Sequence, residues 1–175
     1  MDLKEYIRSI PDYPKKGILF RDITTLIKNE KAFAECINQI VEKSKNYQFD
    51  KIAAIESRGF VFASAVSYVL KKPFIMLRKK NKLPADVHSV DFELEYGTAT
   101  IEVHKDSISE NENVLIIDDL IATGGTAEAA AKLVEISKGK VSAFIFVINL
   151  FDLGGCDSLL KKNYEVENLI EFPGH

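Results

Sequence analysis

The chain has 175 residues, of which 46% are hydrophobic and 28% are charged, proportions that are ordinary for a folded globular protein. Its formal net charge of −3 argues against a nucleic-acid-binding protein that relies on a strongly basic surface. The two cysteines, Cys36 and Cys156, show no metal-ligand spacing, the start lacks a signal-peptide core, and no apolar run approaches the roughly 18 residues of a membrane span. We therefore expect a cytoplasmic protein with no nucleic-acid partner and no membrane association.

Helical and strand-like patterns alternate along the chain. We expect a helix over 2–9, a loop over 11–17, a helix over 30–44, a strand over 51–55, a helix over 60–70 and a strand over 73–77. Residues 78–91 show neither the helical nor the strand-like spacing of apolar residues. We then expect a hairpin over 92–104 that turns at Gly97, a strand over 114–118, a helix over 125–138, a strand over 141–150 and an edge strand over 164–172.

Short apolar strands that alternate with helices predict an α/β fold, in which helices cover both faces of a mostly parallel sheet. Ligands of such sheets bind beyond the carboxyl ends of the strands. The loops 56–59, 78–91 and 118–126 fall at those ends, so we expect the functional site there.

The segment VLIIDDLIATGGTA (114–127) carries the strongest chemical pattern. Its turn ATGGT (122–126) places glycine amides and threonine hydroxyls at the start of a helix, an arrangement that suits an anion such as phosphate. The same residues also fit a plain strand–turn–helix unit with a threonine cap, and the five residues alone favour neither interpretation. The candidate anion-binding residues are Ala122, Thr123, Gly124, Gly125 and Thr126.

Two adjacent acids, Asp118 and Asp119, come just before this turn. Carboxylates repel a phosphate, but they accept hydrogen bonds from hydroxyl groups. A sugar phosphate satisfies both features, with its phosphate on the turn and its vicinal hydroxyls on the acids. The alternative is a pair of solvated acids at a strand end, which fits less well after four consecutive apolar residues.

Other phosphate-binding classes are excluded by their missing motifs. The chain has no GxxxxGK[ST] and no GxGxxG after a strand, so it is neither a P-loop NTPase nor a dinucleotide-binding protein. A response regulator would carry its acid pair after the first strand, whereas this pair comes late in the chain.

LIIDDLIATGGTA resembles the phosphoribosyl pyrophosphate (PRPP) signature of the type I phosphoribosyltransferases. FRD (20–22), ESRGF (56–60), RKKNKLP (78–84) and LEYG (94–97) follow the order and spacing of the adenine-specific members of that family. The resemblance covers nearly the whole chain.

This resemblance implies a type I phosphoribosyltransferase fold over a single domain, residues 1–175. The fold is a mostly parallel twisted sheet flanked by helices, with a small hood from about 1–29 and the C-terminal segment, and a flexible hairpin lid over about 78–104. It also implies the reaction of adenine with PRPP to give AMP and pyrophosphate, Mg²⁺ that arrives on PRPP rather than at a protein metal site, and a homodimer.

By the same resemblance, ESRGF holds the pyrophosphate through Ser57 and Arg58, and the peptide bond between Glu56 and Ser57 is expected to be cis. Alone, Arg58 could instead pair with Glu56 on the surface. In the lid, Arg78 and Lys82 could reach the pyrophosphate, while the other two lysines of RKKNKLP are interpreted as solvated.

LEYG supplies the proposed catalytic carboxylate, Glu95, which would take or relay a proton as the purine attacks. Its neighbour Tyr96 would pack against the sugar side and exclude water. Without the resemblance, the alternative of a hairpin with outward acids Glu93, Glu95 and Glu102 would be preferred.

Adenine recognition is assigned by resemblance to the backbone of Leu19 and Arg21, with Phe20 stacking on one face of the base and Leu150 closing the other. FRD could equally be a core phenylalanine beside a local Arg–Asp pair. Two residues depart from the family pattern: Asn149 replaces an acid and Cys156 replaces an arginine. A PRPP-sensing regulator and a transferase for another base remain as alternatives.

Overall fold

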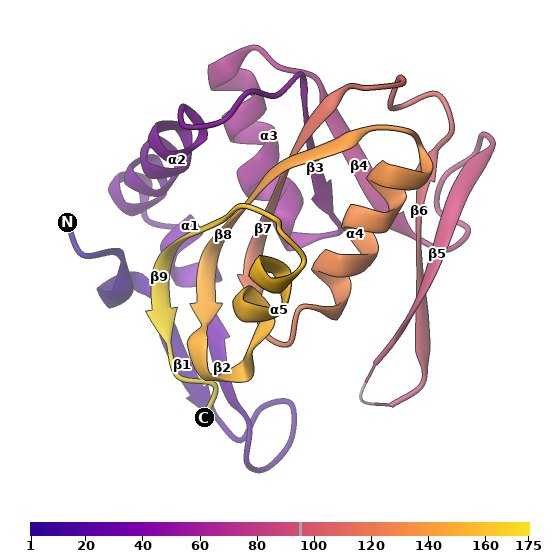
Figure 1. Cartoon of the computed structure of the whole chain (residues 1–175). Coiled ribbons are helices and arrows are strands. Elements are labelled where there is room, and N and C mark those ends of the chain that lie inside the picture. The colour runs from indigo at the N-terminus through magenta and orange to yellow at the C-terminus, as the bar shows by residue number, and fades with distance from the viewer. Residues whose placement is uncertain (95) are drawn as a thin grey trace.

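The computed structural model describes residues 1–94 and 96–175. Its main sheet has seven strands in the order β5-β6-β4-β3-β7-β8-β9 (Figure 1). The strands are β3 (Lys51–Ile55), β4 (Phe74–Lys79), β5 (Val87–Glu93), β6 (Thr98–His104), β7 (Asn113–Ile121), β8 (Lys140–Leu150) and β9 (Val166–Phe172). Strands β4, β3, β7, β8 and β9 pair in parallel, and β5 and β6 add an antiparallel hairpin at one edge. The predicted mostly parallel sheet is therefore confirmed, as is β9 as an edge strand.

Helices cover both faces of this sheet. Helices α2 (Glu30–Ser44) and α3 (Arg58–Leu70) pack on one face, and α4 (Gly125–Ile136) packs on the other. Each face has its own apolar cluster, one built around Ile40 and Phe62 and the other around Leu133 and Phe144. The three helices confirm the predicted segments, with α3 beginning two residues earlier than expected. No described helix has the length and apolarity to cross a membrane.

The N-terminal segment differs from its prediction. The predicted helix over 2–9 is wrong: a short 3₁₀ turn (η1, Leu3–Tyr6) leads into strand β1 (Arg8–Pro11), which pairs antiparallel with β2 (Leu19–Asp22). The side chain of Asp2 caps the turn. Pairing with residues 8 to 14 positions further along the chain outweighs the weak local helical pattern of so short a segment.

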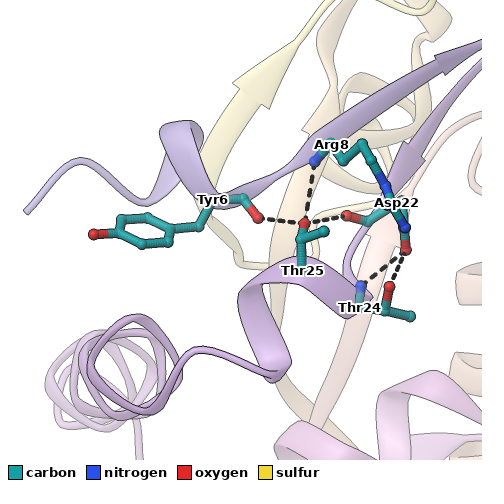
Figure 2. A network of polar contacts seen from close by, with 5 residues as sticks. All are labelled: Tyr6, Arg8, Asp22, Thr24 and Thr25. Carbon is teal, nitrogen blue, oxygen red and sulfur yellow. Dashed lines mark hydrogen bonds and ion pairs between the residues drawn. The ribbon is translucent and has the colours of Figure 1, made fainter.

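Asp22 ties this hairpin to the helix that follows it, α1 (Thr24–Ile27) (Figure 2). Its carboxylate accepts hydrogen bonds from Arg8 Nε at 3.0 Å, from the Thr24 amide at 2.9 Å and from the Thr24 hydroxyl at 2.7 Å. The Thr25 hydroxyl donates to the Tyr6 carbonyl at 2.6 Å. The hydrogen bonds from Thr24 and Arg8 lower the pKa of the buried Asp22 carboxyl to about 2. The Arg–Asp pair expected within FRD therefore forms with Arg8 rather than with Arg21.

The hairpin within the lid is longer than the predicted 92–104, because β5 begins at Val87 rather than near residue 92. Hydrogen bonds to Glu102 of β6 help to hold β5 and the loop before it in place. Glu102 is buried, and it accepts hydrogen bonds from the Asn81 amide at 2.8 Å and the Ser89 hydroxyl at 2.6 Å, which together lower its pKa. The interpretation of Glu102 as an outward-facing acid is therefore wrong.

Two short elements between β8 and β9 have no counterpart in the sequence prediction. They are the 3₁₀ turn η2 (Phe151–Leu153) and helix α5 (Gly155–Lys161). Because β8 and β9 run parallel, the chain must cross back over the sheet between them, and α5 makes this crossover on the α4 face.

Candidate active site

A cavity of about 880 Å³ lies at the carboxyl ends of β3 and β7. The 56–58 loop after β3 forms one wall, the 118–126 segment forms a second, and the lid forms the third. The residues of the lid that line it are Lys79, Lys80, Lys82, Phe92, Leu94, Ala99, Thr100 and Ile101. Three loops that are far apart in the sequence therefore meet at one site.

The ATGGT turn opens helix α4 at the cavity. Gly124 has φ +94°, which favours glycine, and a Cβ on it would lie 3.1 Å from Gly155 Cα. Gly155 donates its amide to the Ala122 carbonyl at 3.0 Å, so the first residue of α5 supports the turn from behind. No side chain caps the start of α4, which leaves the turn's amides and hydroxyls available for an anion.

The two acids occupy the end of β7, also on the cavity wall. Asp119 forms an ion pair with Arg58, with Arg58 Nε 2.7 Å from Asp119 Oδ2. Asp118 Oδ1 accepts the Asp119 amide at 2.9 Å. Burial, followed by the negative charge of Asp119, raises the pKa of Asp118 well above its ordinary value. The expected alternative of two freely solvated acids does not describe this arrangement.

Gly59 shows how tightly Asp118 fits. A Cβ at Gly59 would stand 2.7 Å from Asp118 Oδ1 and 3.4 Å from the Ile117 carbonyl oxygen. The glycine of ESRGF therefore lets the first turn of α3 approach the acid pair closely, which brings the two motifs together at one point.

The loop after β3 joins the lid through Glu56. The Glu56–Ser57 peptide bond is cis, which confirms the prediction. Glu56 Oε1 accepts the Lys79 amide at 2.6 Å and lies 3.3 Å from Arg78 Nε. Glu56 thus pairs with Arg78, whereas Arg58 pairs with Asp119. Ser57 and Lys82 line the cavity, and Arg78 is not among the described residues that line it.

A metal site made of protein side chains is not seen in the described part of the chain, where no three histidine, cysteine, aspartate or glutamate residues cluster suitably. The charged groups on the cavity wall are the acid pair, Glu56, Arg58 and the lid lysines.

The model of the phosphoribosyl transferase domain family matches residues 22–170. The chain belongs to the phosphoribosyltransferase family. The adenine phosphoribosyltransferase of Pelagibacter ubique is 81% identical over 175 residues, 100% of both chains, and that of Chlorobium chlorochromatii is 52% identical over 99% of both. A solved adenine phosphoribosyltransferase from Thermoanaerobacter pseudethanolicus is 46% identical, with a TM-score of 0.93 over 97% of this chain and 98% of its own.

The Saccharomyces cerevisiae adenine phosphoribosyltransferase, solved with adenine and an imino-altritol bisphosphate, is 35% identical with a TM-score of 0.88 over 95% of this chain and 96% of its own. Within the phosphoribosyltransferase family, this chain groups with the adenine phosphoribosyltransferases. The family and the type I fold expected from the sequence are both confirmed.

The segments assigned to adenine lie beside the phosphoribosyltransferase cavity. Phe20 on β2 packs edge-on against Tyr13, with ring centroids 5.1 Å apart, and Arg58 Cζ lies 5.9 Å from the Phe20 ring centroid. Arg58 thus stands between Phe20 and Asp119. Leu150 is buried at the end of β8. Among the described residues that line the cavity, Leu19, Phe20, Arg21 and Leu150 are absent, so this conformation leaves their contact with a base as a prediction.

The tip of the lid turns toward the hood. Tyr96 is 74% exposed, and Lys15 Nζ lies 4.5 Å from its ring centroid. The expected packing of Tyr96 against a sugar stays a prediction. Glu95, the predicted catalytic carboxylate of this phosphoribosyltransferase, lies outside the described residues.

Several residues at the site were missed by the sequence analysis. Lys79 and Lys80, interpreted as solvated, line the cavity. Gly155, which supports the phosphate turn, has no local signal, because only the approach of two distant backbones requires a glycine there. Cys156 follows it on α5, so this departure from the family pattern lies next to the turn.

Proposed function

We propose that this chain transfers the 5-phosphoribosyl group of PRPP to adenine, giving AMP and pyrophosphate in purine salvage. One observation carries the proposal: a single cavity holds a donor-rich glycine turn and an acid pair, in a chain 81% identical to an adenine phosphoribosyltransferase. A phosphate and a diol are the groups that these two parts would bind, and PRPP contains both.

In this proposal the 5′-phosphate binds the 122–126 turn. The amides of Gly124, Gly125 and Thr126 would donate to it, and the hydroxyls of Thr123 and Thr126 would add further donors. The ribose 2′- and 3′-hydroxyls would donate to Asp118 and Asp119. The raised pKa of Asp118 supports this role, because hydroxyl donors would offset the cost of keeping that carboxylate charged in a buried position.

Arg58 has a double role in this mechanism. In the structure it forms an ion pair with Asp119. We infer that pyrophosphate draws the guanidinium away, which frees Asp119 to accept a ribose hydroxyl. Ser57, Lys82 and Arg78 would complete the pyrophosphate site, with Lys79 and Lys80 adding positive charge from the cavity wall.

Mg²⁺ is proposed to arrive with PRPP. The carboxylates of Asp118 and Asp119 on the cavity wall would help to hold the ion there. When bound, the ion would neutralise charge on the pyrophosphate leaving group.

The base is proposed to enter between β2 and the end of β8. Leu19 and Arg21 would read its edge through backbone groups, while Phe20 and Leu150 would contact its faces. Adenine N9 attacks the anomeric carbon, the bond from that carbon to pyrophosphate breaks, and Glu95 receives or relays the proton from the purine. Tyr96 would move with the lid to exclude water.

The chain is proposed to form one domain over residues 1–175 and to act as a cytoplasmic homodimer. The outer surface of α3 supports the dimer, since Val61, Tyr68 and Val69 are exposed there, with Tyr68 85% exposed. Met76 on β4 is exposed on the same face of the sheet, where no described helix covers it. A second copy of the chain would bury this apolar area.

Pyrophosphate release tests the proposed reaction. The purified protein should release pyrophosphate from PRPP and Mg²⁺ with adenine, and much more slowly with hypoxanthine, guanine, xanthine or orotate. Activity with another base only would overturn the assignment of adenine. Binding of PRPP without turnover of any base would support the regulator alternative.

Two substitutions test the assigned roles. Glu95→Gln should lower kcat with little change in PRPP affinity, whereas Asp118→Asn combined with Asp119→Asn should weaken PRPP binding first. Small and equal effects from both would contradict the separation of roles.

A further inference from the structure

Residues 172–174, called here the C-terminal strap, join the two segments proposed to bind adenine. Figure 1 shows the C-terminus beside the ends of β1 and β2 and the end of β8. Phe172 is the last residue of β9 and pairs in register with Leu150 of β8. The strap therefore starts next to one face of the proposed base site and continues toward the hood.

Arg21 attaches the strap to β2. Its Nη2 donates to the Pro173 carbonyl at 3.2 Å, its Nη1 donates to the Ser9 hydroxyl at 2.5 Å, and its Cζ lies 4.4 Å from the Phe172 ring centroid. Burial lowers the pKa of the guanidinium. The Arg21 side chain thus faces the strap, which leaves its backbone as the part available to a base.

Asp152 attaches the other side of the strap to η2, the turn that directly follows Leu150. The Gly174 amide donates to Asp152 Oδ1 at 2.6 Å. A Cβ at Gly174 would stand 2.6 Å from Leu153 Cγ and 2.8 Å from Asp152 Oδ1. The strap therefore packs so closely against this turn that a side chain at Gly174 would clash with it.

The hood hairpin needs such an attachment. In the described part of the chain, β2 pairs only with β1, and these two strands form a sheet separate from the main one. No backbone ladder sets the distance between β2 and β8. Side-chain contacts do this instead. Ile7 and Ile23 pack into the same apolar cluster as Leu150, and the strap contacts β2 and η2 through Arg21 and Asp152.

We propose that the C-terminal strap sets the spacing between β2 and the end of β8 and thereby determines adenine affinity. Arg21, Asp152 and Gly174 act as positioning residues through the strap. This inference rests on the proposed function, because it assumes that the base binds between Leu19–Arg21 and Leu150. It predicts that loosening the strap impairs adenine binding and leaves PRPP binding intact, because the PRPP residues belong to β3, β7 and α4.

Steady-state kinetics of three variants test the proposal. Asp152→Ala removes the acceptor for the strap, Gly174→Val inserts a side chain against η2, and Arg21→Lys removes the forked donor to Pro173. Each should raise KM for adenine roughly fivefold, the factor that one hydrogen bond typically contributes, and should change KM for PRPP by less than about twofold. Lys43→Ala is the matched control. It removes the ion pair between Lys43 and Glu167 at the opposite end of β9 and should leave both KM values unchanged.

A double variant tests whether the hydrogen bonds of Arg21 and Asp152 act through the same strap. If they do, Arg21→Ala combined with Asp152→Ala should raise KM for adenine little more than either change alone. Full additivity, or equal rises in both KM values, would overturn the proposal. Thermal unfolding identifies any variant that fails to fold, and the exposed Asp152 provides the variant least affected by this risk. An inactive wild-type protein would contradict the proposed function, whereas an active wild type with unaltered variants would contradict only the strap.

Discussion

Gly155 is the residue whose importance depends most on tertiary structure. A Cβ there would stand 2.5 Å from the Ala122 carbonyl oxygen, 2.7 Å from Ile121 Cγ1 and 3.0 Å from the Gly124 nitrogen. An added methyl group would clash at these distances, so the phosphate turn would have to move. In the sequence, Gly155 is one of two glycines in an unpredicted connection, so only the folded chain identifies its role.

Gly155→Ala should therefore disturb PRPP binding from outside the PRPP site. We expect KM for PRPP to rise roughly tenfold or more, because displaced turn amides lose several hydrogen bonds to phosphate. Steady-state kinetics with PRPP as the varied substrate measure this. Cys156→Ala, at the next position of α5, is the control and should change KM little; an unaltered KM in Gly155→Ala would show that the turn tolerates the shift.

Asp22 is predicted to stabilise the fold in a pH-dependent way. Its folded-state pKa of about 2 lies below the ordinary value of 3.8, so its contribution is complete above about pH 4 and is lost as the pH falls toward 2. Because its partner Arg8 is 58% exposed, we expect Asp22→Asn to lower the free energy of unfolding by roughly 1–2 kcal/mol at pH 7.

Urea unfolding at pH 7 and pH 3 checks this prediction. The difference between wild type and Asp22→Asn should be smaller at pH 3, where the wild-type carboxylate has begun to lose its advantage. Asp157→Asn, at an exposed position on α5, serves as the control. A difference that grows as the pH falls would contradict the assigned role of the carboxylate.

At the scale of elements, the sequence predicts the main sheet well because its strands are short, apolar and separated by clear helical patterns. It fails where pairing between distant segments decides the structure. Residues 8–11 become a strand because they pair with β2, and β5 starts early because it pairs with β6 from Val87 onward. Glu102 of β6 adds hydrogen bonds to Ser89 of β5 and to Asn81 in the preceding loop. Such hydrogen bonds leave no periodic trace in the sequence.

The candidate site likewise has parts that the sequence predicts and parts that depend on contacts between distant segments. The glycine turn, the acid pair and ESRGF are contiguous motifs, and the structure places them on one cavity. The pairing of Arg58 with Asp119 instead of Glu56 was not predictable, since it depends on the approach of α3 to β7 that Gly59 permits.

The lid should move as two parts. Its base is anchored, because Val90, Ile101 and Val103 are buried against the α4 cluster, and β6 pairs with β4 through Arg78 and Lys79. Its tip is exposed at Leu94 and Tyr96. Hydrogen exchange should therefore be fast in 91–94 and 96–100 and slow in 101–104, and PRPP should slow exchange at the tip only. Uniform exchange along the hairpin, or no effect of PRPP, would contradict a hinged tip.

At the scale of the whole molecule, the exposed apolar surface of α3 and β4 predicts self-association. Tyr68→Arg places a charge in the centre of this surface and should shift the protein from dimer to monomer in sedimentation velocity experiments. Leu160→Arg, a similarly exposed apolar position on α5, should leave the dimer intact. Equal sedimentation of wild type and Tyr68→Arg would place the interface elsewhere.

The strap also has a consequence for how the protein is made. The proposed adenine site needs residues 19–21, which leave the ribosome early, and residues 172–174, which leave it more than 150 residues later. The PRPP-binding loops, in contrast, all precede residue 127. The nucleobase pocket of a nascent chain can therefore be completed only after synthesis has passed residue 174, later than all the loops proposed to bind PRPP have been made.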